Sequence, residues 1–243
     1  MSHHRAPTLP CLALALLAGL SPRPAPPAVP DAHQAVEALE REWAEIFYRL
    51  PKDQQAEQLR ALLARAEDLV VRFPGAAEPL IMEAIVLCAY AAADPGLGAL
   101  RRVERARELL IRSIAIDPRA MGGSAYITLG NLYYRLPGWP ISYGNDRAAR
   151  HYLETALKLF PDALDSNYFY GDFLLAQGEF QAALPYLEKA DRIPLAPGTA
   201  SLSELQLKES LRQALAEARA RSRKRDDFFS RLLPGFGDGG GSP

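Results

Sequence analysis

Four stretches of the sequence end alike, with a helix-like apolar pattern that stops at a proline. These prolines, Pro74, Pro118, Pro161 and Pro194, follow one another at intervals of 44, 43 and 33 residues. Before the last three, small, large and small residues recur at spacings of four and three, which places them on one helix face. The triplets are Ala106, Leu110 and Ser113; Ala149, Leu153 and Ala156; and Ala183, Leu187 and Ala190. Because small residues let a second helix approach and the proline ends the first, the pattern predicts repeated helix pairs.

An upstream helix carries a matching signature in two of these repeats. One copy consists of Tyr126, Leu129-Gly130 and Tyr133, and the other of Asn167, Tyr170-Gly171 and Leu174. Together the paired helices resemble the tetratricopeptide repeat, whose pattern runs from an aromatic residue through Leu-Gly and Tyr to Ala, an aromatic residue and Pro. The last copy keeps the family's spacing, with twelve residues from Gly171 to Ala183. The middle copy is stretched by an insertion, and the first, at about 79–118, lacks the Leu-Gly pair.

The flanking segments are helical as well. Val36, Leu39, Trp43, Ile46, Phe47 and Leu50 follow helical steps after a capping Asp31, Pro51 ends that helix, and a second helix is expected at about 53–73. At the other end, Ser201 and Glu204 have the spacing of a capping box that opens an amphipathic helix. The predicted fold is all-α: an antiparallel helix-pair solenoid with a C-terminal capping helix, nine or ten helices between 31 and 225, and no sheet.

The first thirty residues read as an export signal. Arg5 precedes an apolar run from Leu9 to Leu20, which suits a secretory leader and is too short to span a bilayer. An uncleaved apolar leader or a misassigned start is the alternative. The expected organisation is a signal peptide at 1–21, a Pro/Ala-rich linker at 22–30, the repeat domain at 31–200, the capping helix at 201–227, and an apolar then Gly-rich tail at 228–243. Cleavage would leave Cys88 as the one cysteine, expected to be a buried apolar residue.

Charge and residue spacing argue against several classes of function. The net charge is −1, so nucleic-acid binding has no electrostatic support. Beyond the leader only His33 and His151 remain, and no phosphate loop, metal-ligand spacing or nucleophile-base pattern accompanies them. We therefore expect no enzyme activity, no metal and no cofactor.

The candidate binding site is the concave face of the repeat stack. In a tetratricopeptide stack this face is lined by the first helix of each pair, which here supplies Ile127, Asn131 and Tyr134, then Tyr168, Asp172 and Leu175. The inserted segment 136–146 adds Trp139, Ile141 and Tyr143 in a loop stiffened by Pro137 and Pro140. An apolar loop of this kind either packs back on the scaffold or meets a ligand. A mixed aromatic and polar groove suits a protein or peptide partner, with a small solute as the alternative.

The basic run 219–225 and the apolar segment after it have two interpretations. Positive charge is favourable at a helix C-terminus, which is a structural role. Basic residues followed by Phe228 and Phe229 would also suit a membrane surface.

Residues 79–200 resemble a group of exported bacterial tetratricopeptide proteins, and more loosely the helical T-component of TRAP-type periplasmic transporters. The motifs that carry the first likeness are Gly96-Leu-Gly-Ala-Leu100, Gly138-Trp-Pro140 with Tyr143-Gly144, and Asn167-Tyr-Phe-Tyr-Gly-Asp172. The resemblance implies a periplasmic or otherwise exported adaptor that catalyses nothing. The alternative is an accessory transporter component that encloses a small solute among the aromatic side chains.

Overall fold

The computed structural model describes residues 31–220, and these residues fold into nine α-helices and one short 3₁₀ turn, without a strand. The helices are α1 (Ala32–Arg49), α2 (Lys52–Arg72), α3 (Ala77–Ala93), α4 (Leu97–Ile116), α5 (Ser124–Arg135), α6 (Asp146–Leu159), α7 (Leu164–Ala176), α8 (Phe180–Arg192) and α9 (Leu202–Ala220), with the turn η1 (Ala120–Gly123) before α5. The predicted all-α class is therefore confirmed. The expected signal peptide, the linker, the end of the capping helix and the tail lie outside the described residues.

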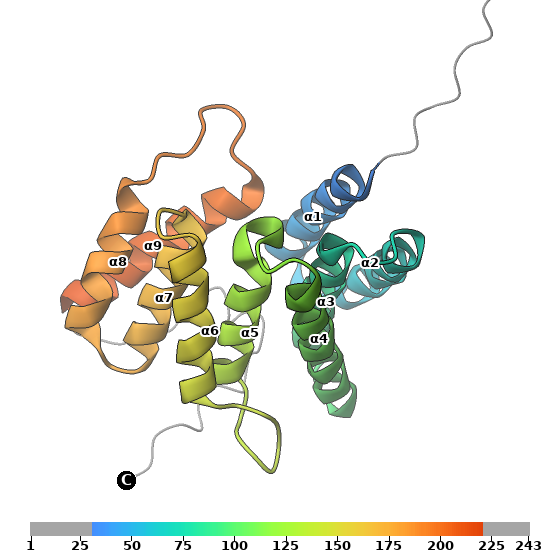
Figure 1. The fold of residues 1–243 in the computed structure, drawn as a ribbon, viewed down its shortest axis with the longest axis horizontal. Coiled ribbons are helices and arrows are strands. Elements are labelled where there is room, and N and C mark those ends of the chain that lie inside the picture. The colour runs from blue at the N-terminus through green and yellow to red at the C-terminus, as the bar shows by residue number, and fades with distance from the viewer. Residues whose placement is uncertain (1–30, 221–243) are drawn as a thin grey trace, which may run out of the picture.

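The helices pack in sequential pairs. Extensive contacts join α3 to α4, α5 to α6 and α7 to α8, while α2 packs on both α1 and α3. Figure 1 shows the first two pairs on one side of the molecule and α5 to α9 on the other. This arrangement is the predicted helix-pair solenoid.

The triplets found in the sequence form the contact within each pair. All nine side chains are at most 1% exposed: Ala106, Leu110, Ser113, Ala149, Leu153, Ala156, Ala183, Leu187 and Ala190. The two signature glycines face the large residues of these triplets. A Cβ on Gly171 would lie 2.6 Å from Leu187 Cδ2, and one on Gly130 would lie 2.5 Å from Leu153 Cγ. The glycines thus allow the paired helices to approach more closely than any side chain permits.

The predicted caps are present at both ends of the described chain. The Asp31 carboxylate accepts a hydrogen bond from the Gln34 amide at 2.9 Å and begins α1. At α9, the Glu204 amide donates to Ser201 Oγ at 3.1 Å, and the Ser201 amide donates to Glu204 Oε2 at 2.7 Å. This reciprocal pair satisfies two amides that a helix start leaves without partners.

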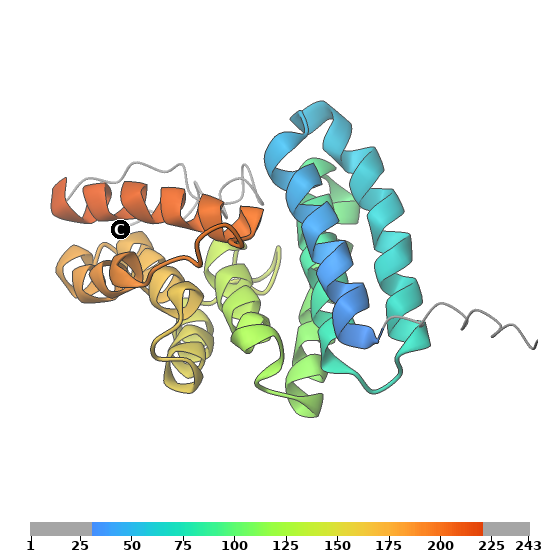
Figure 2. The same ribbon diagram turned by 90° about the horizontal axis from the view of Figure 1, so that it is seen from above.

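The last helix reaches both ends of the stack. α9 packs on α8, as expected of a capping helix, and it also contacts α7 and α1. In Figure 2 the start of α9, in orange, lies toward α1, and the helix then runs across the other end of the molecule. The segment between α8 and α9 therefore brings the last helix back to the first, which a simple stack with an end cap would not do.

Candidate functional site

The structure buries most of the residues that were predicted to line an open groove. Ile127, Asn131, Tyr168, Asp172 and Leu175 are each no more than 6% exposed, and Tyr134 is partly buried. The expectation of an open face here is wrong. The physical reason is that α7 contacts α5, α6, α8 and α9, so that eleven of its thirteen residues are buried. Whether these six residues contribute to binding stays a prediction.

Two of the predicted residues meet across neighbouring helices, together with a third that the sequence did not reveal. Tyr134 Oη donates to Asp172 Oδ2 at 2.6 Å, and Arg135 Nη2 donates to the same oxygen at 2.7 Å. The Arg135 and Asp172 side chains are both 8% exposed. Arg135 was missed because an arginine in the last turn of a helix is usually read as a solvated residue that favours the helix dipole. This buried ion pair ties α5 to α7 and leaves Asp172 engaged inside the protein.

The insertion between α5 and α6, which we call the Trp139 loop (residues 136–145), is anchored by one of its aromatic residues. Tyr143 is partly buried and its hydroxyl donates to the Val103 carbonyl oxygen of α4 at 2.9 Å. Its ring meets the Tyr133 ring edge-on at a centroid distance of 5.2 Å, and the Arg107 guanidinium lies 5.0 Å from its centroid. Burial raises the pKa of the Tyr143 hydroxyl, so it stays protonated as a donor. Tyr143 therefore packs back on the scaffold.

The backbone at the base of the loop is also fixed. The Gly144 amide donates to the Pro137 carbonyl at 3.0 Å, and the Asn145 amide donates to the Tyr133 carbonyl at 2.6 Å. A Cβ on Gly144 would lie 2.0 Å from the Leu136 carbonyl oxygen, so only glycine fits where the two arms of the loop meet. Asn145 then caps α6 by accepting from the Ala148 amide at 2.9 Å.

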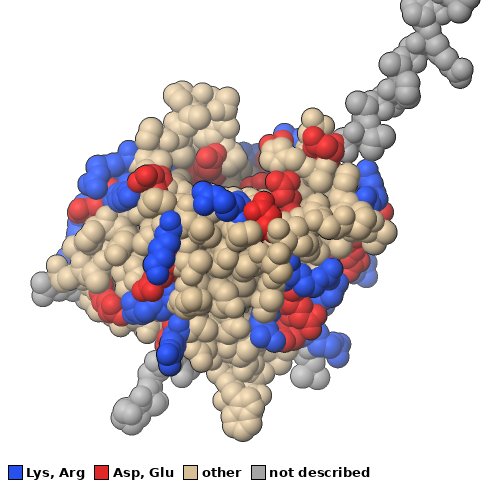
Figure 3. All heavy atoms as spheres, viewed as in Figure 1, with Lys and Arg blue, Asp and Glu red and all other residues tan. Residues whose placement is uncertain are grey.

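The tip of the same loop projects into solvent. Trp139 is 88% exposed and Ile141 is 63% exposed, and Trp139 is the one exposed aromatic side chain in the part of the chain that the structure describes. No residue from 136 to 145 is charged. In Figure 3 the projection at the bottom of the molecule, where Figure 1 draws this loop, carries no acidic or basic atoms. Tyr143 thus packs back on the scaffold, while Trp139 and Ile141 face outward, and whether they meet a ligand stays a prediction.

Other features of the described chain offer little for chemistry. Within residues 31–220, no group of three His, Cys, Asp or Glu side chains could hold a metal ion. Cys88 is buried as expected, and burial raises the pKa of its thiol to about 12, which keeps it un-ionised. None of the described helices combines the length and apolarity that a membrane span requires. One cleft of about 460 Å³ lies between the middle of α1 and residues 199–203.

Comparison with known families supports the repeat assignment. Residues 144–198, which include α6, α7 and α8, match the tetratricopeptide repeat family. No curated protein matches the chain. The helix pairs and this match define a helical protein that contains a tetratricopeptide repeat. Such repeats usually serve as scaffolds that bind proteins or peptides, without catalysis of their own.

Proposed function

We propose that this protein is an exported, non-catalytic binding scaffold that holds a protein partner through the Trp139 loop. The observation that carries the proposal is the 88% exposure of Trp139 at the tip of a loop whose base is fixed by hydrogen bonds. An exposed tryptophan beside an exposed isoleucine is costly to keep in water, and such apolar side chains at a fixed position typically mark a contact surface.

The rigidity of the loop favours binding. Association costs free energy whenever it orders a flexible segment. Here Tyr143, Gly144 and Asn145 already hold the loop in place, so a partner would meet a pre-ordered tip. Tryptophan is also enriched among interface residues whose loss costs about 2 kcal/mol or more, which is roughly 30-fold in Kd.

The residues of the predicted groove take a supporting role in this proposal. Tyr134, Arg135 and Asp172 join α5 to α7, and the Trp139 loop starts at the end of α5. Ile127, Asn131, Tyr168 and Leu175 are buried in the same two helices. We infer that they fix the direction of α5 and thereby the position of the loop.

Export and the solute alternative rest on different parts of the chain. Export is supported by the apolar run after Arg5 and by the resemblance to exported tetratricopeptide proteins. The solute alternative requires a ligand enclosed beside the aromatic residues. Trp139 is exposed, and the cleft at α1 is lined by no aromatic side chain, so the scaffold interpretation is the better supported of the two.

The test is a comparison of partner capture by two variants of the chain lacking residues 1–30. The Trp139→Ala plus Ile141→Ser variant removes the exposed tip, and Val71→Ala removes an equally solvent-exposed apolar side chain from α2, where Val71 is 78% exposed. We expect the loop variant to lose at least roughly 30-fold in captured partner, and Val71→Ala to capture as the wild type does. Equal capture of partner by the wild type and both variants, with unchanged thermal melting, would show that the Trp139 loop does not hold the partner.

A further inference from the structure

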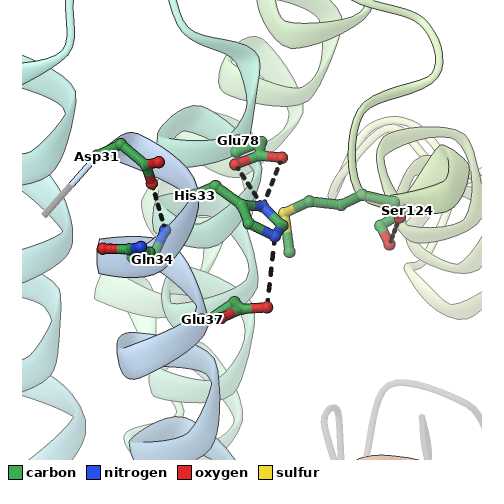
Figure 4. Close-up of polar contacts among 7 residues, drawn as sticks. Asp31, His33, Gln34, Glu37, Glu78 and Ser124 are labelled. Carbon is green, nitrogen blue, oxygen red and sulfur yellow. Dashed lines mark hydrogen bonds and ion pairs between the residues drawn. The ribbon is translucent and has the colours of Figure 1, made fainter.

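The amino-terminal half of α1 is joined to α3 through a histidine. His33 Nδ1 lies 3.2 Å from Glu78 Oε1 of α3, and His33 Nε2 lies 3.3 Å from Glu37 Oε1 of α1. Figure 4 shows the imidazole between the two carboxylates. Both carboxylates can accept a hydrogen bond from the ring only when both ring nitrogens carry a proton, because the neutral ring has a single N–H. The complete bridge therefore requires the imidazolium ion.

About two turns further along, α1 contacts α9, and carboxyl groups of α1, α7 and α9 act on one another electrostatically. These groups belong to Glu40 of α1, which lines the cleft beside residues 199–203, to Asp165 of α7 and to Glu204 of α9. Glu40 and Asp165 are partly buried. The Glu204 carboxylate accepts the Ser201 amide in the capping box that begins α9. Three helices thus bring like charges together at the point where the end of the stack returns to its beginning.

The other charged groups that line the cleft are mostly acidic. Glu37, Arg41 and Glu45 also line the cleft between α1 and residues 199–203. Glu45 is paired with Arg49 at 2.8 Å, and the charged groups that shift the pKa of Glu40 are Glu37 and Glu204, which raise it, and His33, which lowers it. Asp165 faces Glu204 and Glu40, with no cation among the groups that perturb it.

Protonation acts in the same direction at both contacts. The hydrogen bond to Glu78 raises the pKa of His33 above its ordinary value, so its contribution to stability is present at acidic pH and is lost as the pH rises through that raised pKa. Burial, aided by Glu204 and Glu40, raises the pKa of Asp165 to about 6, and burial likewise raises the pKa of Glu40. An acid whose pKa is raised by folding destabilises the fold as it ionises, here between about pH 4 and pH 6.

From these two contacts we propose that α1 is an acid-strengthened clasp, which is held on α3 and α9 at about pH 5 and loosens in two steps as the pH rises to 8, first at the carboxyl groups and then at the histidine. In the acidic state the imidazolium bridges Glu37 and Glu78, and at least one carboxyl of the trio is neutral. At pH 8 the bridge is lost and three ionised carboxylates repel one another across α1, α7 and α9. Because α9 contacts both α1 and α8, the clasp controls how firmly the last pair is tied to the first.

Hydrogen exchange of the full chain at pH 5 and pH 8, corrected for the intrinsic rates, tests the proposal. We expect protection of peptides from α1 and from residues 199–210 to fall at least several-fold at pH 8, while peptides from α5 and α6 keep theirs. The Asp165→Asn plus Glu40→Gln variant should retain much of that protection at pH 8. Asp68→Asn, an exposed carboxyl on α2 that pairs with Arg72, should behave as the wild type.

Two results would overturn the clasp. The first is equal protection of α1 at both pH values in the wild type. The second is an unaltered pH response in the double variant. Should that variant fail to fold, His33→Gln is used in its place, because this substitution removes the titrating bridge at an exposed position. The clasp then requires that α1 of His33→Gln be less protected from exchange than wild-type α1 at pH 5, but equally protected at pH 8.

Discussion

The closeness of α7 and α8 can be tested by adding a single methyl group. In Gly171→Ala the new Cβ would lie 2.6 Å from Leu187 Cδ2 and 2.7 Å from Leu187 Cγ, whereas carbon atoms in contact are about 3.5–4.0 Å apart. Leu187 is 0% exposed and belongs to the hydrophobic core, so it cannot move without displacing buried neighbours. Overpacking of this kind costs about 1–3 kcal/mol. The gain from replacing a helical glycine by alanine offsets roughly 0.5–1 kcal/mol of that cost.

Thermal melting followed by far-UV circular dichroism is the appropriate assay. A net loss of about 1–2 kcal/mol corresponds to a fall in Tm of roughly 2–8 °C for a chain of this size. Gly98→Ala is the matched control, because Gly98 lies in α4 and a Cβ there would be 3.4 Å from its nearest neighbour, Arg102 Nη2, an ordinary contact. We expect Gly98→Ala to leave Tm unchanged or to raise it, so that of the two alanine substitutions only Gly171→Ala lowers Tm.

A second substitution separates overpacking from other effects of the mutation. Leu187→Ala alone should cost about 2–5 kcal/mol, as a buried leucine truncation does. Combined with Gly171→Ala it removes the atoms that the new Cβ would strike, so the double variant should be more stable than the sum of the single effects by about 1 kcal/mol or more. Additive effects, or a Gly171→Ala protein that melts as the wild type does, would refute the register in which Gly171 faces Leu187.

Two further predictions concern the groups that position the Trp139 loop. Asp172→Ala should destabilise the protein by about 3–5 kcal/mol, because it leaves the buried Arg135 guanidinium without its 2.7 Å ion pair. Urea unfolding measures this loss, and a value below about 1 kcal/mol would show that the pair has no structural role. Tyr143→Phe removes the 2.9 Å hydrogen bond to the Val103 carbonyl and should lower the free energy of unfolding by about 1 kcal/mol. Hydrogen exchange should become faster in residues 136–145 alone, and unchanged exchange there would contradict the anchoring role of Tyr143.

The helix pairs were predictable because the features that specify them are local. Spacings of four and three residues place Ala183, Leu187 and Ala190 on one face wherever a helix forms, and all three are 0% exposed. The caps at Asp31 and Ser201 were predictable for the same reason, since each acts within three residues of itself. The glycine contacts followed from the family pattern, in which a small residue stands where the paired helices touch.

The burial of the predicted groove residues depends on contacts between segments that are distant in the sequence. Nothing in the local sequence around Tyr168 indicates that α9 would return to α1 and that α7 would be packed against four other helices. The Arg135–Asp172 pair joins residues 37 positions apart and has no periodic signature. Within one loop, the outward direction of Trp139 and the inward direction of Tyr143 are decided by the position of the Val103 carbonyl on α4, which composition does not reveal.

Site-specific photo-crosslinking can show whether the tip of the Trp139 loop contacts a protein partner. A photoreactive phenylalanine analogue would be placed at Ile141, 63% exposed beside Trp139, and in a second chain at Val71, 78% exposed on α2. Both full-length chains would be expressed in their own cells and irradiated. We expect a discrete covalent adduct with one protein from position 141, none from position 71, and loss of the adduct when Trp139→Ala is added. Adducts of equal yield from both positions, or an adduct at 141 that Trp139→Ala leaves untouched, would contradict this contact.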